Sequence, residues 1–491
     1  MSGSARRYPP YADFRQAVRR HSPRDLIPAI AARAADEKDI AMQWDKSWPA
    51  GFPPWIYAAM ARDCVLYSND HRGKPVDDRA VTRMRNLFSI SHDEKEDHPD
   101  FSYLSVLGGY VYEQIPYQVP IKEELARAYL LWVDTPGTEG WPGSVDWTEL
   151  LGGSIEDALA VSFMIAVGVM KNGGHFDPQW LASDAYQALG EMVPAAAVAR
   201  AVMDKLTATI AEARADGRSA PELPPAYQRY AYNPLIKTPL MDIGDGLRYA
   251  PQPQFLLRAM APQNLYYRGM RLWADKNFGA IMGARVAAYT GRQLQHTGEH
   301  TVFQEFRWNK KGVGGIDSSD WFLITPQATI LIECKSAQMK LGARAGTLIG
   351  LQEANETISK AYRQLANNAA EIRTGNTAYA AIPSGRPLIG LVVTAEPFYH
   401  ANDRAVRMTI KDPGLPVLTV SLRDIEMLAV LSPSQVGTAL LAIVQDDVLN
   451  TWMLSKSLAE VLPDFDKTEN QLIDETFDRV FLPMTGRGKA E

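Results

Sequence analysis

Hydrophobic residues recur with the spacing of α-helices through most of the first 215 positions of the chain. The segment 22–37, SPRDLIPAIAARAADE, places a capping serine before Pro23, and proline is favoured at the first helical position. The segment 154–174, SIEDALAVSFMIAVGVMKNGG, begins with a capping-box arrangement and ends at two glycines. A further helix is expected from Pro194 to about Ala215. These patterns predict an all-helical domain over residues 1–215.

The pattern changes after a stretch that is rich in proline and polar residues. Residues 216–234 have the composition of a linker. Beyond them, helical segments alternate with short runs that have the character of β-strands, at 301–308, 320–324, 329–335 and 387–396. Such alternation predicts an α/β (α+β) domain over residues 235–430. Residues 431–491 are expected to form C-terminal helices that pack on this domain.

Composition narrows the class of protein. The formal net charge is −6, which argues against a wholesale nucleic-acid coat but allows a local basic groove. The two cysteines, Cys64 and Cys334, form neither a disulfide framework nor a zinc motif. The longest apolar stretch, 158–170, is shorter than the ~20 residues that span a bilayer. We therefore expect a cytoplasmic protein without a membrane segment, and a solvated loop at the charged run 91–100, SHDEKEDHPD.

Three charged residues interrupt two apolar runs in the segment 315–337, GIDSSDWFLITPQATILIECKSA. Asp320 stands just before the first run, and Glu333 and Lys335 lie at the end of the second. Charges inside a core strand are costly unless they are paired or bind something. The alternative is a surface hairpin with a cross-strand salt bridge, but both runs are apolar enough to be buried.

The two runs are spaced to form a β-hairpin. If residues 326–327, Pro-Gln, form its turn, Asp320 falls opposite Glu333, with the Cβ atoms of such a pair only ~5 Å apart. Side chains alternate along a strand, so Glu333 and Lys335 share one face and Cys334 points to the other. Two carboxylates and an ammonium group are therefore expected to meet at one end of the hairpin.

This grouping suits a divalent cation and a phosphodiester substrate. Two carboxylates that close repel each other unless a hard cation lies between them, and Mg²⁺ (or Mn²⁺) prefers oxygen ligands. A bound cation of this kind activates water near neutral pH, and Lys335 is placed to stabilise developing negative charge. The flanking segments are basic, which favours contact with a phosphate backbone. The residues expected to make that contact are Lys310, Lys311, Lys340 and Arg344.

An aspartate, a hydrophobic hairpin and a Glu-x-Lys that closes the second strand resemble the PD-(D/E)XK nuclease superfamily, over roughly residues 235–430. The resemblance implies a restriction-endonuclease-like α/β/α domain that has a central mixed sheet and hydrolyses phosphodiester bonds. It implies catalytic roles for Asp320, Glu333 and Lys335, and a metal site formed by Asp320, Glu333 and the carbonyl of Cys334. In this family a glutamine or basic residue on the following helix often faces the site, which makes Gln364 and its neighbour Tyr362 candidate accessory residues.

The chain departs from the family pattern on the helix that precedes the sheet. Many members carry a metal-binding glutamate there, but the stretch 278–289, FGAIMGARVAAY, has alanines instead. Asp275, Glu299 or Glu305 are the candidates to replace it, or the site uses one metal held by two carboxylates. For Glu305, a structural ion pair with Arg307 or Lys335 is favoured over metal binding. The segment 296–300, HTGEH, is not the helical zinc-binding pattern, so we expect a loop there.

The favoured hypothesis is a metal-dependent endonuclease that acts on DNA, in defence against foreign DNA by analogy with the family. Two alternatives remain. One is a catalytically degenerate nuclease fold that binds nucleic acid or acts as a scaffold, and the other is an RNA nuclease. A homodimer is expected for double-strand cleavage, because one site per chain cuts one strand.

Overall fold

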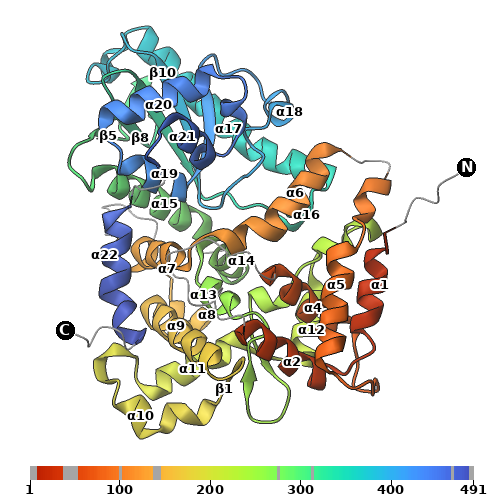
Figure 1. The fold of residues 1–491 in the computed structure, drawn as a ribbon. Helices are drawn as coiled ribbons and strands as arrows, with labels where there is room; N and C mark the ends of the chain where they lie inside the picture. The colour runs from red at the N-terminus through yellow and green to blue at the C-terminus, as the bar shows by residue number, and fades with distance from the viewer. Residues whose placement is uncertain are drawn as a thin grey trace, which may run out of the picture.

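The computed structural model describes residues 8–36, 53–98, 102–135, 145–273, 277–310, 314–465 and 469–485. The protein is a mixed helix-and-sheet structure, with the N-terminal helices in the lower part of Figure 1 and a β-sheet flanked by helices in the upper part. The main helices of the N-terminal part are α1 (Tyr11–Val18), α2 (Pro23–Asp36), α4 (Pro54–Tyr67), α5 (Asp78–Ile90), α6 (Tyr103–Gln114), α7 (Ile121–Tyr129), α8 (Trp147–Leu151), α9 (Ile155–Lys171), α11 (Ala196–Leu206) and α12 (Ile210–Ser219).

The helix starts that were predicted from capping residues are confirmed. Helix α2 begins at Pro23. Helix α9 begins with the capping box of Ser154 and Asp157. The helix expected from Pro194 to Ala215 is wrong as a single element, because residues 207–209 are extended between α11 and α12. Thr209 there caps α12, and a residue at a helix N-cap leaves the helical conformation.

The first 215 residues are not purely helical, which corrects the all-helical prediction. Short strands β1 (His175–Phe176) and β2 (Thr207–Thr209) pair with β3 (Leu240–Asp242) and β4 (Arg248–Tyr249) in a four-stranded sheet of order β1-β4-β3-β2. The strands are two or three residues long, too short to show a period-2 pattern in the sequence. The sheet draws residues beyond 235 into the N-terminal part, and Leu235 and Met241 share a hydrophobic core with α4.

Residues 216–234, predicted as a linker, are packed against the N-terminal helices. Tyr227 and Arg229 are buried. The Arg229 guanidinium forms two hydrogen bonds of 3.0 Å with the carboxylate of Glu113, and its carbonyl accepts a hydrogen bond of 2.8 Å from Arg62. The prolines do not make this stretch a flexible linker. Its backbone forms 3-10 turns at 225–230 and 234–236, which lie against the neighbouring elements.

The charged run at 91–100 is not simply a solvated loop. Lys95 is fully buried, and its ammonium group lies 3.8 Å from the centre of the Tyr230 ring. It donates hydrogen bonds to the carbonyls of Ser105 (2.8 Å) and Ala345 (3.3 Å) and lies 3.6 Å from a carboxylate oxygen of Asp93. Burial lowers the pKa of Lys95 to about 8. Contacts with residues distant in the sequence therefore stabilise a buried charge, although the polar sequence predicts that this charge is exposed to solvent.

The second sheet has five strands in the order β11-β10-β9-β8-β5. Strands β5, β8 and β9 are antiparallel neighbours, whereas β9, β10 and β11 run parallel, so the predicted mixed sheet is confirmed. The predicted strand at 301–308 is divided, and its second half starts a separate two-stranded ribbon, β6–β7. The strands are β5 (Thr301–Gln304), β6 (Arg307–Lys310), β7 (Gly314–Asp317), β8 (Trp321–Ile324), β9 (Thr329–Lys335), β10 (Leu388–Thr394) and β11 (Val417–Ser421).

Helices cover both faces of this sheet, with α15 (Phe278–Gln295) and α19 (Leu422–Ala429) on one face and α17 (Leu348–Arg373) on the other (Figure 1). Alternation along β9 divides its side chains between the two cores. Ile330 and Ile332 join the core under α15, and Leu331 joins the core under α17. A central strand that is apolar on both sides is the signature of a sheet buried between helical layers.

The C-terminal helices divide between the two parts of the protein. Helices α20 (Pro433–Gln445) and α21 (Leu454–Val461) stay near the sheet, and Gln327 in the hairpin turn donates to Ser434 of α20 (2.9 Å). Helix α22 (Gln471–Val480) instead packs on α7, where Lys122 and Asp474 form an ion pair of 2.8 Å (Figure 1). The expectation that all of residues 431–491 pack on the sheet domain is therefore wrong for α22.

A buried ion-pair cluster joins the N-terminal helices to the sheet domain. Arg127 of α7 binds both carboxylate oxygens of Glu426 in α19, at 2.5 and 2.7 Å. The Tyr289 hydroxyl of α15 donates to the same carboxylate at 2.6 Å. Arg423 and Glu123 add a second link at 2.5 Å. These contacts fix α7 against both helices on one face of the sheet.

One helical stretch, Trp147–Lys171, has the length and apolar composition to cross a membrane, and 67% of its most apolar window is buried inside the protein. It comprises α8 and α9, so it is longer than the apolar run 158–170 read from the sequence. Its burial is that of a core helix, and α9 packs against α11.

Candidate active site

The β8–β9 hairpin has the register that its sequence predicts. Residues 326–327 form the turn, closed by a hydrogen bond of 3.0 Å from the Thr325 amide to the Ala328 carbonyl. Trp321 pairs with Ile332, the last pair before the charged residues. The next facing positions are Asp320 and Glu333. The sequence-based prediction of which residues face each other is therefore confirmed.

Strand β5 brings a third carboxylate to the same end of the sheet. Gln304 pairs with Trp321, and the amide of Glu305 donates to the carbonyl of Asp320 at 2.8 Å. Glu305, Asp320 and Glu333 consequently occupy one row across three adjacent strands. Neighbouring strands lie ~4.8 Å apart, so the three backbones are close enough for their charges to interact. We call this row the carboxylate row.

The middle member of the carboxylate row is held by its neighbour strand. The Cys334 amide donates to Oδ2 of Asp320 at 2.5 Å. Burial raises the pKa of Asp320, and this hydrogen bond and the charge of Lys335 oppose the rise. In a strand, the amide and carbonyl of one residue point toward the same neighbour, so the Cys334 carbonyl also faces the Asp320 side. The Cys334 side chain is buried in the core under α15, as alternation predicts.

Glu333 and Lys335 form a close pair at the end of β9. Nζ of Lys335 lies 2.6 Å from Oε1 of Glu333, and Glu333 is only 3% exposed. Burial first, and then the charge of Asp320, raise the pKa of Glu333 to about 7. Partial burial and the charge of Asp320 likewise raise the pKa of Glu305 to about 7. The carboxylate row therefore has affinity for positive charge, whether protons or a cation, near neutral pH.

The oxygen atoms in this part of the protein are of the type that a hard cation binds, but the described residues do not form a complete set of metal ligands. Within the described ranges, no group of three His, Cys, Asp or Glu side chains is arranged to hold a metal ion. The oxygens of Asp320 and Glu333, with the Cys334 carbonyl, are of the type that Mg²⁺ or Mn²⁺ binds, and such ions usually keep several waters. The negative charge of Asp320 contributes to the raised pKa of Glu333. A bound cation would offset this repulsion between the two carboxylates.

A cleft of about 810 Å³ opens beside two members of the carboxylate row, Asp320 and Glu305. Glu333 lies on the α17 face of the sheet, because it pairs with Val392 of the core under α17. Asp320, Glu305 and Trp321 line it on the sheet side, and Gly283, Ala284 and Ala287 line it on the α15 side. The alanines that replace the expected helix glutamate therefore face the carboxylates across open space. Of the candidates to replace that glutamate, only Glu305 lines the cleft. Glu299 is exposed in the turn after α15, and Asp275 lies outside the described residues.

The accessory residues expected on the following helix do not reach the carboxylate row. Gln364 is exposed on α17, and its backbone carbonyl accepts a hydrogen bond of 2.9 Å from the Asn368 side chain. Tyr362 is buried against the sheet with its hydroxyl beside Thr419. Thr419 pairs with Val392, which pairs with Glu333, so Tyr362 lies on the same face two strands away.

Two of the four basic residues expected to contact phosphate already have acidic partners. Lys340 pairs with Glu353 at 2.9 Å on the surface, and Arg344 pairs with the buried Glu396 at 2.7 Å. Lys310 ends β6, and Lys311 lies outside the described residues. The stretch 310–345 therefore gives weaker support for a phosphate-binding track than its charge indicates.

Two residues that line the far end of the cleft, Arg292 and His296, are not predicted as site residues from the sequence. The sequence predicts a loop at His296, and this residue follows directly on α15. The helical period offered a signal: Ala284, Ala288 and Arg292 are four residues apart and share one face of α15.

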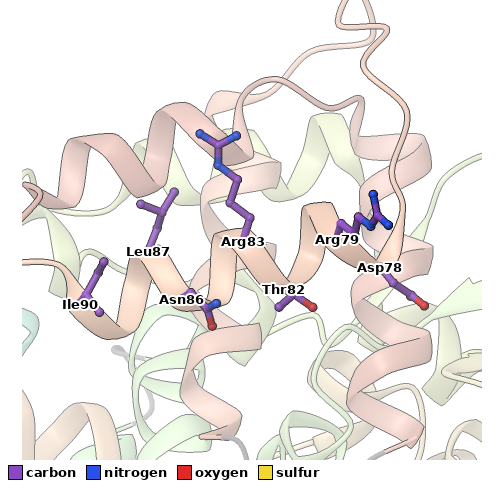
Figure 2. A pocket seen from close by; sticks show the side chains of 7 residues that line it. All are labelled: Asp78, Arg79, Thr82, Arg83, Asn86, Leu87 and Ile90. Carbon is purple, nitrogen blue, oxygen red and sulfur yellow. The ribbon is translucent and has the colours of Figure 1, made fainter.

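A second hollow lies along α5 and is lined by residues of that helix alone (Figure 2). It displays the exposed arginines Arg79 and Arg83 beside Leu87 and Ile90. Asp78, the one carboxylate among its lining residues, pairs with Arg33 at 2.9 Å. With one carboxylate and no cysteine, histidine or second acid, this hollow lacks the groups that the carboxylate row brings together.

No protein-family model, curated protein or solved structure matches this chain.

Proposed function

We propose that the protein is a metal-dependent nuclease that hydrolyses phosphodiester bonds of DNA, with a restriction-endonuclease-like domain built on the five-stranded sheet. The observation that carries this proposal is the carboxylate row beside the Glu333–Lys335 pair at the end of a hairpin, with two members of the row, Asp320 and Glu305, lining a cleft. Clustered groups with perturbed pKa values in a cleft are characteristic of catalytic sites. The resemblance to the PD-(D/E)XK superfamily rests on the same residues, Asp320, Glu333 and Lys335.

Each residue has a distinct role in the proposed reaction. Asp320 and Glu333 would hold Mg²⁺ or Mn²⁺ with the Cys334 carbonyl, and such a cation polarises a phosphoryl oxygen and makes a bound water more acidic. Lys335 neutralises Glu333 at rest and stabilises negative charge on the reacting phosphate. Glu305, with a pKa of about 7 at the exposed side of the row, takes up the proton of the attacking water.

A catalytically degenerate nuclease fold is the second candidate. Two observations favour it, namely the small residues on α15 where a metal-binding glutamate is expected, and the lack of a three-ligand group within the described ranges. Such a protein would bind nucleic acid without cutting it. A cytoplasmic location, action in defence against foreign DNA and pairing of two chains for double-strand cleavage belong to the proposal in its nuclease form.

The direct test is cleavage by the purified full-length protein. Supercoiled plasmid and an RNA hairpin of matched length are incubated with Mg²⁺, Mn²⁺ or EDTA. The proposal expects nicking of the plasmid with either cation and none with EDTA. Cleavage of RNA alone assigns the RNA alternative, and binding of DNA without cleavage under any cation assigns the degenerate one.

Divalent cations are expected to stabilise the protein more at high pH than at low pH. The folded-state pKa of Glu333, about 7, lies above its ordinary value of 4.5, so the folded protein holds this proton more firmly than the unfolded chain. Without a cation, the free energy of unfolding therefore falls as pH rises from about 4.5 to about 7. A divalent cation competes with that proton for Glu333. At a concentration a hundredfold above its Kd, its binding raises the free energy of unfolding by about 3 kcal/mol.

The measurement is the thermal unfolding midpoint with and without Mn²⁺, near pH 5 and near pH 8. We expect a clear rise at the higher pH and little change at the lower one. The Glu333→Gln variant serves as the control and should lose most of the rise. An equal shift at both pH values would show that Mn²⁺ binds elsewhere.

A further inference from the structure

The cleft continues beyond the carboxylate row along α15. Ser336, just past the end of β9, lies against Gly279 and Gly283 near the start of α15, so Asp320 and Glu305 are toward that end of the cleft. Arg292 and His296 lie at the other end, in and just after the last turn of α15. The helix rises ~1.5 Å per residue, so the 12 positions from 284 to 296 extend roughly 18 Å along the cleft. The hollow is therefore elongated, with acidic groups at one end and cationic groups at the other.

Small side chains keep the middle of the cleft open. Gly283, Ala284, Ala287 and Ala288 line its α15 wall. Trp321 forms the sheet side and is fixed by a hydrogen bond of 2.8 Å from its Nε1 to the Ala287 carbonyl. The Trp321 ring packs so closely on Gly291 that a Cβ there would overlap it. Helix α15 and the sheet are thus in direct contact at Trp321. The cleft is open because the α15 residues that line it are glycine and alanine.

The cationic end keeps a net positive charge. The carboxylate of Asp134, on the N-terminal side of the cleft, lies 2.9 Å from Arg292 and 3.2 Å from Arg479. One negative charge is therefore shared by two guanidinium groups. His296 is exposed in the same part of the cleft, and its ring can donate a hydrogen bond to a phosphate oxygen. This end attracts a phosphate group, whereas the carboxylate row repels one unless a cation bridges the two.

We propose that the cleft along α15 binds a single strand of nucleic acid next to the bond to be cut, with one backbone phosphate between Arg292 and His296. The proposal rests on the proposed nuclease function and adds the path of the substrate. The alanine stretch gives room for the sugar-phosphate chain, and the cleft volume of about 810 Å³ lies within the roughly 300–1,000 Å³ of pockets that enclose whole small molecules. One strand of a nucleic acid fits in such a space.

The test measures binding without cleavage. A fluorescein-labelled single-stranded DNA oligonucleotide is titrated with full-length protein in Ca²⁺, and anisotropy is recorded. Ala288→Trp fills the middle of the cleft and is expected to weaken binding at least ~10-fold, as loss of a main contact typically does. The matched control is Ala280→Trp, an exposed position on the same helix outside the cleft lining, which should bind as the wild type does.

His296→Glu gives an independent measure, because this residue is exposed and its replacement leaves the core intact. We expect weaker binding and a salt dependence that is shallower by about one phosphate contact. Equal affinity of Ala288→Trp and Ala280→Trp, an unchanged salt dependence of His296→Glu, or tighter binding of a duplex than of the single strand would each overturn the proposal. Binding with the expected pattern but no cleavage in Mg²⁺ would reject only the nuclease function. Cleavage with equal binding of the two tryptophan variants would reject only the binding path.

Discussion

The Glu333→Gln variant is expected to cut plasmid DNA at least ~100-fold more slowly than the wild type. Glutamine keeps the size of the side chain but removes the charge that would hold a divalent cation. Loss of even an outer partner of a metal ligand typically costs about 10–100-fold, so loss of a direct ligand should cost more. The measurement is the initial rate of nicking under saturating Mg²⁺, with circular dichroism to show that the fold is kept.

Lys335→Ala belongs to the same series and should lower the rate by about 10²–10³-fold, the usual effect of removing one group that stabilises transition-state charge. Glu460→Gln is the matched control. Glu460 pairs with Lys456 at 3.0 Å on the surface of α21, so its replacement should leave the rate unchanged. If all variants nick DNA as fast as the wild type does, the cleavage comes from a contaminant or another site, and the carboxylate row is not catalytic.

Replacing Arg127 with alanine is expected to give the largest loss of stability, about 3–5 kcal/mol in the free energy of unfolding. Arg127 is buried and binds both oxygens of Glu426, which also accepts a hydrogen bond from Tyr289. Removing the arginine leaves a carboxylate buried without its opposite charge. Most of the penalty is therefore the cost of the unpaired Glu426 rather than the intrinsic strength of the pair.

The measurement is urea-induced unfolding followed by tryptophan fluorescence. Lys456→Ala, which breaks the exposed Lys456–Glu460 pair, should change the free energy by less than about 1 kcal/mol. The double variant Arg127→Met, Glu426→Leu removes both buried charges and should recover part of the loss. Equal effects of the buried and the exposed single variants would show that the link between α7 and α19 contributes little to stability.

The hairpin could be predicted from sequence because its signals are local. Two apolar runs are separated by a short turn, so the register that sets Asp320 opposite Glu333 follows from the spacing alone. The helix starts at Pro23 and Ser154 were predictable for the same reason, because capping depends on residues within one turn. Glu305 was a candidate because its strand comes just before the hairpin, and its backbone bond to Asp320 places it next to that residue.

Features that depend on distant partners were not predictable in this way. The charge of Lys95 indicates solvent exposure until the ring of Tyr230 and the carbonyls of Ser105 and Ala345 are placed around it. The proline-rich stretch 216–234 has a linker's composition, yet Arg229 finds Glu113 more than a hundred positions away. The cationic end of the cleft escaped notice because Asp134, which orients Arg292, lies in the other part of the protein.

The sequence by itself determined the mixture of helices and strands, the hairpin register and the grouping of Asp320, Glu333 and Lys335 at one end of the hairpin, because strand alternation and short turns act between near neighbours. The parallel pairing of β9, β10 and β11 depends on residues far apart in the chain. The tertiary structure alone decided which charges are buried, where α22 packs, and that small residues on α15 leave an open cleft beside the carboxylate row. Those properties depend on which surfaces meet when the chain closes on itself, and no local pattern records that.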